Sequence, residues 1–199
     1  CLIAAGAYFG LGPGIYRKAD GRLPLSTRIL LAPLLVGQRL SLWYYRRQCR
    51  PWDEVAPRLW IGARLTNGEA EEALRRGVNA VLDLTAEFSE AAPLLNCRYL
   101  NVPILDLTRP TPEQLDRCLA FLSENASLGT VYIHCKIGYS RSAAVAGAYL
   151  MASGAAASAA EAVDRLRAVR PSIVIRPEAW DTLKRFEAAL RDRLPVAAS

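Results

Sequence analysis

The 199-residue sequence has a single histidine, no Cys-x-x-Cys pair and no uninterrupted apolar run of 18 or more residues. A closed zinc site needs several nearby cysteine or histidine ligands, so no metal centre is expected. The five cysteines lie at irregular positions, 1, 49, 97, 118 and 135, and their odd number does not suit a disulfide framework. A reducing compartment fits better, and no complete membrane-spanning helix is expected within the chain.

The net charge of the chain is concentrated at its start, and the charges of the remaining residues nearly cancel. Residues 1–50 hold eight Lys or Arg against one acid, a net charge of +7, so the other residues together carry −1 of the overall +6. A nucleic-acid interface would need basic residues spread over the folded body, so none is expected. Hydrophobic residues make up 52% and charged residues 22%, which excludes a disordered tail and predicts a packed core.

The first fifty residues are apolar as well as basic. Cys1–Leu11 is too short to cross a bilayer and resembles the end of a spanning helix, although Cys1 could instead be a lipid-bearing cysteine. Gly12, Pro13 and Gly14 then break any helix. Apolar residues from Leu23 to Tyr45 are followed by a basic run, a pattern typical of a segment in the headgroup region of a membrane. The alternative is an arm that packs on the domain and covers its core.

From Trp52 onward the pattern predicts an α/β domain. Strands are expected at 58–61, 80–84, 98–104 and 130–134, and helices at 68–76, at 111 onward, at 143–151 and in two later amphipathic segments. Asn67 is expected to cap the first helix, and Thr111-Pro-Glu-Gln114 is a capping box for the second. Strands that alternate with helices indicate a central, mostly parallel sheet with helices on both faces.

The loop after the strand at 130–134 carries the chemistry. A strand stops at Cys135, six residues turn, and a helix begins at about Arg141. Such a turn directs backbone N–H groups toward an anion at the positive end of a helix dipole. Gly138 allows the turn, Arg141 supplies a planar fork for two phosphate oxygens, and the same field should lower the pKa of Cys135. We expect a phosphate cradle with a thiolate nucleophile at its floor.

His134-Cys135, followed by five residues and Arg141-Ser142, resembles the signature of the cysteine-dependent protein tyrosine phosphatase superfamily, and the short chain resembles its dual-specificity branch. The resemblance covers residues 51–194 as a catalytic domain and leaves 1–50 as a membrane-proximal arm. It implies the phosphatase fold, no cofactor, a phosphocysteine on Cys135 and a supporting role for His134. Phosphate binding is expected from the loop, with Ser142 donating to the sulfur as it leaves; the loop residues are Lys136, Ile137, Gly138, Tyr139, Ser140 and Arg141. Sulfurtransferases of the rhodanese type share a loop cysteine, but the Ser-Arg-Ser ending favours phosphate.

Family members also carry a general acid about thirty residues upstream of the cysteine. Asp106, 29 residues before Cys135 and just before a proline-bearing loop, is the candidate, and Asp83 is a competitor that lies too far upstream. Arg170-Pro-Ser-Ile-Val-Ile-Arg176-Pro177 resembles the segment before the last helix and is expected to support the loop from behind.

The substrate remains open between a phosphoprotein and an anionic phospholipid. Lys136 resembles the basic residue of lipid-directed members such as the mitochondrial phosphatidylglycerophosphate phosphatases and the phosphoinositide 3-phosphatases, whereas Ile137 and Tyr139 depart from both. Tyr139 removes a charge that an inositol headgroup would need. We expect a membrane-associated enzyme with its catalytic domain in the cytoplasm, as at a bacterial inner membrane. The alternatives are a catalytically inactive phosphate-binding module and a membrane-interaction protein.

Overall fold

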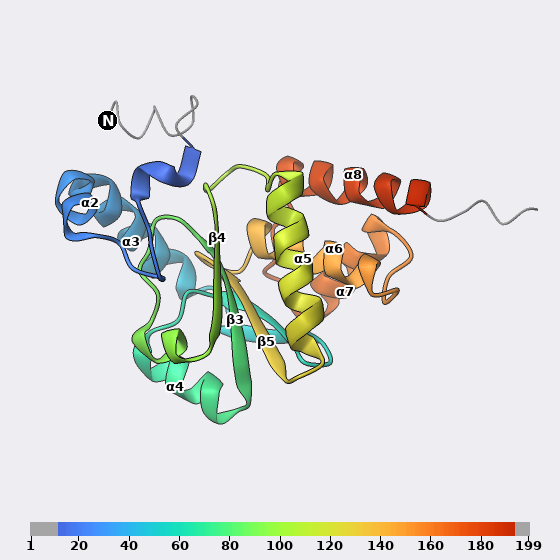
Figure 1. The fold of residues 1–199 in the computed structure, drawn as a ribbon, viewed down its shortest axis with the longest axis horizontal. Helices are drawn as coiled ribbons and strands as arrows, with labels where there is room; N and C mark the ends of the chain where they lie inside the picture. Colours follow the sequence, from blue (N-terminus) through green and yellow to red (C-terminus); the bar gives the residue numbers. More distant parts are fainter. Residues whose placement is uncertain (1–11, 194–199) are drawn as a thin grey trace, which may run out of the picture.

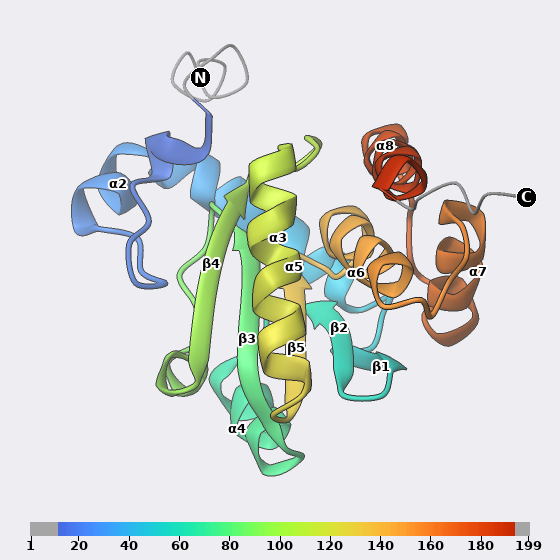
Figure 2. The ribbon, with the colours of Figure 1, turned by 45° about the vertical axis from the view of Figure 1, so that its right-hand side comes forward.

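Five strands form one mixed sheet in the computed structural model, which describes residues 12–193. The order across the sheet is β1-β2-β5-β3-β4, visible in Figure 2 from right to left. All neighbours pair in parallel except β1 and β2, so the expected mostly parallel sheet is confirmed. The strands are β1 Trp52–Ala56, β2 Leu59–Ala63, β3 Val78–Thr85, β4 Arg98–Ile104 and β5 Thr130–Cys135.

Helices cover both faces of this sheet, as expected (Figure 1). One face packs against α5 Pro112–Ala126 and α6 Ser140–Ala152, with α7 Ala159–Val169 and α8 Pro177–Arg193 packed against α6. The other face packs against α4 Asn67–Arg75 and the 3-10 helix η3 Ala92–Asn96. Ten residues of α6, from Arg141 to Met151, are buried, which confirms that this helix lies in the middle of the fold.

Local capping chemistry fixes where two of these helices begin. Thr111 and Gln114 form the expected capping box at the start of α5. For α4 the cap expected at Asn67 is wrong by one residue: Thr66 accepts from the Glu69 N–H, and the Glu69 side chain accepts from the Thr66 N–H. A complete capping box satisfies two helix-end N–H groups, whereas Asn67 as cap would have satisfied one.

The segment before the sheet forms an arm, defined here as residues 12–50. It contains the 3-10 helix η2 Gly12–Tyr16 and the helices α2 Leu25–Leu30 and α3 Ala32–Arg46. One cluster joins three of its buried side chains to Ala86 and Leu105 of the body, at the end of the sheet toward which β3 and β4 point (Figure 2); the three are Tyr16, Leu31 and Leu35. The expected apolar segment Cys1–Leu11 lies outside the described residues.

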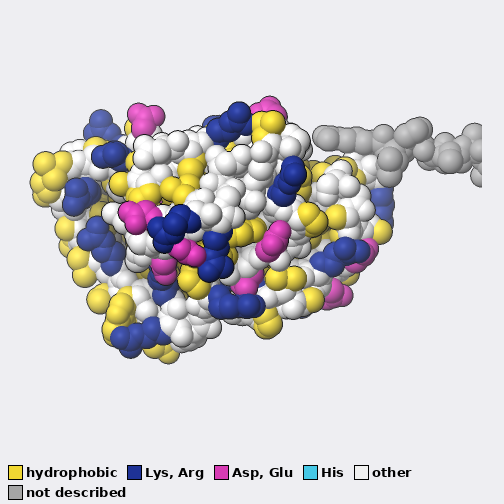
Figure 3. All heavy atoms as spheres, turned by 90° about the horizontal axis from the view of Figure 1, so that it is seen from below, with side chains coloured by type: hydrophobic (Ala, Val, Ile, Leu, Met, Phe, Trp, Pro, Cys, Tyr) yellow, Lys and Arg dark blue, Asp and Glu magenta, His cyan; other side chains and the backbone are white. Residues whose placement is uncertain are grey.

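The opposite face of the arm is open to solvent. Hydrophobic side chains there are more than half exposed, among them Leu25, Ile29, Leu40, Trp43 and Tyr44. Basic side chains are interspersed with hydrophobic ones at this end of the molecule (Figure 3). None of the helices between residues 12 and 193 combines the length and the hydropathy that crossing a membrane requires.

Candidate active site

The loop between β5 and α6 has a backbone that only glycine can complete. Gly138 has φ of +70°, and a Cβ there would lie 2.5 Å from the carbonyl carbon of Gly62. The turn therefore packs directly on β2, and α6 begins at Ser140, one residue before the expected start. This tight turn places the Cys135 sulfur at the amino end of a buried helix.

Cys135 lies where its thiolate is favoured. Burial alone would raise the pKa of this thiol, but the Arg141 guanidinium, the Ser142 hydroxyl and the N–H groups of Ser142 and Tyr139 outweigh it, so the pKa is lowered. The Ser142 hydroxyl is buried and makes no hydrogen bond to another described oxygen or nitrogen. It is therefore free to donate to the sulfur.

Arg141 is held in place by an acid that sequence reasoning missed. Its Nη2 lies 2.7 Å from Glu87 Oε1 and its Nη1 lies 3.2 Å from Glu87 Oε2, while Nη1 also donates to the Ile104 carbonyl at 2.8 Å. Both side chains are almost fully buried, and Glu87 and the Cys135 thiolate outweigh desolvation and raise the pKa of Arg141. The Nε edge of the guanidinium makes no hydrogen bond to any described residue, which leaves a fork for a bound anion.

Asp106 reaches the same place from the end of β4. Its Oδ1 lies 3.5 Å from Arg141 Nη2, and its side chain is about one third exposed, at 34%. The next residue, Leu107, has φ of +63° in a turn closed by the Thr108 N–H on the Leu105 carbonyl. Asp83, the competitor, is fully buried and pairs with Lys18, so it has no access to a substrate.

Lys136 does not stand free at the lip of the cradle, where its charge was expected. Its side chain is 8% exposed, with Nζ donating to Gln38 Oε1 of α3 at 2.6 Å and lying 3.9 Å from Asp106 Oδ2. Burial lowers the pKa of this ammonium although Asp106 and Glu87 oppose the shift. Lys136 thus connects the arm to the loop and to the candidate acid.

These groups line one cavity of about 390 Å³. The lining contains Cys135, Arg141 and Asp106, and the loop adds Lys136, Ile137, Tyr139 and Ser140. Two walls were not foreseen: Ser41 and Tyr45 come from α3 of the arm, and Val174 and Arg176 come from the segment before α8. The sequence predicted the residues at the floor of the pocket. The walls come from segments that are distant in sequence, so only the folded structure reveals them.

Arg170 holds the loop from behind, as expected for its segment. The side chain is buried and donates to the carbonyls of Ile137 at 3.1 Å and Gly138 at 3.3 Å. Asp53 of β1 balances its charge through a 2.6 Å contact to Nη1. With its carbonyls held in this way, the loop keeps its N–H groups directed at the pocket.

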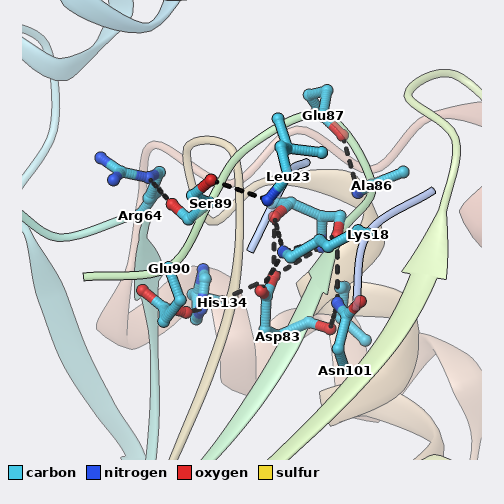
Figure 4. A network of polar contacts seen from close by, with 12 residues as sticks. Lys18, Leu23, Arg64, Asp83, Ala86, Glu87, Ser89, Glu90, Asn101 and His134 are labelled. Atoms are coloured by element: carbon cyan, nitrogen blue, oxygen red, sulfur yellow. Dashed lines mark hydrogen bonds and ion pairs between the residues drawn. The ribbon is translucent and has the colours of Figure 1, made fainter. Parts of the chain in front are cut away.

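A buried charge network lies on the other side of His134 (Figure 4). His134 Nε2 lies 2.6 Å from Glu90 Oε2 and 3.7 Å from Asp83 Oδ1, and Lys18 of the arm pairs with Asp83. Burial would lower the pKa of His134, but the two carboxylates raise it to about 9; burial would raise the pKa of Asp83, but Lys18 and His134 lower it to about 2. Ligand atoms of Asp83, Glu90 and His134 lie within 4.8 Å of one another, a spacing a metal could bridge, but Lys18 and the imidazolium already balance these carboxylates.

Glu87 and Glu90 share a signal that sequence reasoning could have used. Both follow β3, the strand that pairs with β5, so their carboxylates emerge at the edge of the sheet where Cys135 ends its strand. Acids at this edge have cations as near neighbours, which is why two glutamates can be buried there.

Comparisons with known proteins agree with this geometry. The sequence profile described as "Dual specificity phosphatase, catalytic domain" matches residues 59–189. The chain is 28% identical over 166 residues to the phosphatidylglycerophosphate phosphatase PTPMT2 of Arabidopsis thaliana, covering 80% of this chain and 72% of that protein. It is 30% identical over 186 residues to human phosphatidylglycerophosphatase and protein-tyrosine phosphatase 1, covering 83% and 88%.

Solved structures give the same result. A crystal structure of PTPMT1 superposes with a TM-score of 0.64 at 25% identity, covering 71% of this chain and 97% of that one. Human DUSP28 gives 0.63 at 28% identity, covering 71% and 99%. The matched region contains the strand, loop and helix that hold Cys135 and Arg141. The chain therefore belongs to the dual specificity phosphatase family and is a hydrolase of phosphate monoesters.

Proposed function

We propose that Cys135 and Arg141 hydrolyse a phosphate monoester through a phosphocysteine intermediate. The observation that carries this proposal is a cysteine with a lowered pKa beside a clamped guanidinium in one open cavity. The thiolate attacks phosphorus, and the bond from phosphorus to the ester oxygen breaks. Arg141, fixed by Glu87, offers its free edge to the phosphoryl oxygens, and the N–H groups of the loop bind the others.

Asp106 and Ser142 serve the proton transfers in this proposal. Asp106, protonated at the start, donates to the leaving oxygen; as a carboxylate it then takes a proton from the water that attacks the phosphocysteine. Phosphate leaves and Ser142 donates a hydrogen bond to the returning thiolate. The partial exposure of Asp106 and its position 3.5 Å from Arg141 support its access to a bound phosphate ester.

The substrate we propose is a phosphomonoester on an anionic membrane phospholipid such as phosphatidylglycerophosphate. The relatives named for that lipid and the apolar, basic outer face of the arm support this choice. A phosphoprotein is the second candidate, favoured by the match to dual specificity protein phosphatase 12 of Mus musculus, 35% identical over 141 residues. Side-by-side turnover of phosphatidylglycerophosphate vesicles and a phosphotyrosine peptide panel separates the two.

We propose further that the arm holds the enzyme at a membrane surface, with the catalytic domain on the cytoplasmic side, as at a bacterial inner membrane. Exposed Leu40 and Trp43 on α3 would enter the interface, where aromatic and aliphatic side chains are favoured. Leu40→Ser/Trp43→Ser should reduce cosedimentation with anionic vesicles, while Leu128→Ser, an exposed leucine far from the arm in sequence, should not. Equal binding by both proteins would exclude the arm as the contact.

Cys135→Ser tests the chemistry directly. Turnover of an aryl phosphate should fall at least about a thousandfold, because a hydroxyl is a far weaker nucleophile than a thiolate. Binding of inorganic phosphate, measured by its inhibition constant or by calorimetry, should survive because the loop and Arg141 remain. Steady turnover by the unmodified protein excludes the inactive phosphate-binding module, and residual activity in the variant above one part in a thousand contradicts the intermediate.

A further inference from the structure

A second cavity, larger than the catalytic one, lies on the other side of α3. Its volume is about 570 Å³, and we call it the arm cavity. Helical spacing explains the separation, because Ser41 and Tyr45 line the catalytic pocket whereas Ala32, Val36 and Arg39 line the arm cavity. The remaining walls come from Leu23 and α2 of the arm and from Arg64 and residues 87–89 of the body.

Three arginines line this cavity. Arg28 and Arg39 are exposed and form no ion pair with another described residue. Arg64 is turned inward by a 2.8 Å hydrogen bond from Nε to the Ser89 carbonyl. Burial lowers the pKa of Arg64, and the cations of Arg39 and Arg46 act in the same direction against Glu90 and Asp83. The cavity therefore has an excess of positive charge.

The single acid in the lining does not cancel this excess. Glu87 is buried, and both of its carboxylate oxygens are taken by Arg141 on the catalytic side. An anion in the arm cavity would thus meet Arg28 and Arg39, which form no ion pair within residues 12–193. Arg is also the side chain best suited to bind phosphate oxygens in pairs.

The rim of the cavity is apolar and faces solvent. Leu25, Ile29 and Val36 line it and are 67%, 68% and 53% exposed. A neighbouring hollow lined by Val36, Arg39, Leu40 and Trp43 continues the apolar surface along the outer face of α3. A free phosphate ion gains nothing from these side chains, whereas an amphiphile covers them with its hydrocarbon chains.

We propose that the arm cavity binds the phosphate headgroup of an anionic membrane lipid, with Arg28 and Arg39 on the phosphate and the acyl chains over Val36 and Leu40. This lipid is a ligand and not a substrate, since the nucleophile Cys135 lies in the other pocket and the one hydroxyl in the lining, that of Ser89, accepts from the Leu23 N–H. The site goes beyond the proposed catalysis and predicts one saturable lipid per chain, where a merely basic surface predicts non-stoichiometric attraction.

The test uses dihexanoyl phosphatidylglycerol below its micelle concentration, titrated into the whole protein by calorimetry. This lipid is a phosphodiester and not one of the phosphate monoesters that the catalytic pocket hydrolyses. We expect one site per chain, with affinity reduced at least about tenfold in Arg28→Gln/Arg39→Gln. The matched control is Arg17→Gln/Arg22→Gln, which removes the same charge from two exposed arm arginines outside the cavity lining and should bind like the original protein.

Each other outcome overturns the proposal. Equal loss in both double variants would indicate general electrostatic attraction. Equal binding of dihexanoyl phosphatidylcholine would exclude recognition of the net charge. Equal binding of glycerophosphoglycerol, the same phosphodiester without acyl chains, would make this a phosphate site with no use for the apolar rim. Aryl phosphate turnover is measured on the same samples and should be unchanged in both variants. A failure of the catalytic proposal is therefore seen separately, in Cys135→Ser.

Discussion

The two cavities beside α3 differ in how their arginine side chains are held. In the catalytic pocket Arg141 is almost fully buried and clamped by Glu87, with a further hydrogen bond to a backbone carbonyl. In the arm cavity Arg28 and Arg39 are exposed and have no acid partner among the described residues. A clamped cation is already oriented when charge develops on a substrate, which favours chemistry. A free cation keeps its rotamers and loses them only on binding, which favours reversible capture of a ligand.

Among the changes that test this contrast, the largest effect should come from Asp106→Asn, which alters the catalytic pocket alone. Esters with poor leaving groups, such as glycerol phosphates, should lose roughly 10²- to 10⁴-fold in kcat, because the leaving oxygen departs without a proton. Activated aryl phosphates need less protonation and should lose much less. Steady-state kinetics on both substrates measures the difference, and calorimetry should find lipid binding in the arm cavity unchanged. If both esters slow equally, another group is the acid.

A smaller effect, on folding, is expected from Lys18→Met. The Lys18 ammonium is a buried cation that the arm contributes, and it is paired with Asp83. Its loss leaves the Asp83 carboxylate buried without this partner. The free energy of unfolding in urea should fall by about 3–5 kcal/mol. Lys184→Met, at an exposed lysine without an ion pair, serves as the control. The double variant Lys18→Met/Asp83→Asn should recover most of the loss, and no recovery would mean that the pair is not the cause.

The smallest effect is a dependence on pH that the buried network should show and the arm cavity should not. Because Glu90 and Asp83 raise the pKa of His134 from 6.5 to about 9, the stability it contributes is complete below pH 6.5 and is lost as pH rises through 9. The free energy of unfolding should fall by roughly 3 kcal/mol over this window. His134 is the only histidine, so its imidazole NMR signals report the titration directly. Lipid binding by the arm cavity should stay constant, since guanidinium groups do not titrate there. Deprotonation of the imidazole near pH 6.5 would contradict the network.

The sequence predicted the parts of the fold that depend on local patterns. The loop from Cys135 to Ser142, the capping box at Thr111 and the strand at 98–104 are each decided by neighbouring residues. Strand β1 was missed because Asp53 and Glu54 interrupt its apolar pattern. Asp53 is nevertheless buried, because its charge is balanced by Arg170, 117 residues further along the chain.

The same reason explains what was missed in the site. Glu87 is 54 residues from Arg141, and Lys18 is 65 residues from Asp83, so no periodicity could reveal either pair. In the sequence alone, each of these acids resembles an ordinary residue of an exposed loop, because Asp and Glu are mostly exposed in proteins. Burial of a charge depends on a partner from elsewhere in the fold, and that information is absent from any local window.

The contact between the arm and the catalytic pocket limits how much of the substrate selectivity can be inferred from relatives that match only the catalytic domain. The family match begins at residue 59, whereas Gln38, Ser41 and Tyr45 either hold Lys136 or face the same pocket as Cys135. Two enzymes that agree throughout the matched region would still differ in this wall. We therefore expect substrate preference to depend partly on a segment outside the family match, and exchanging α3 between relatives is the direct test.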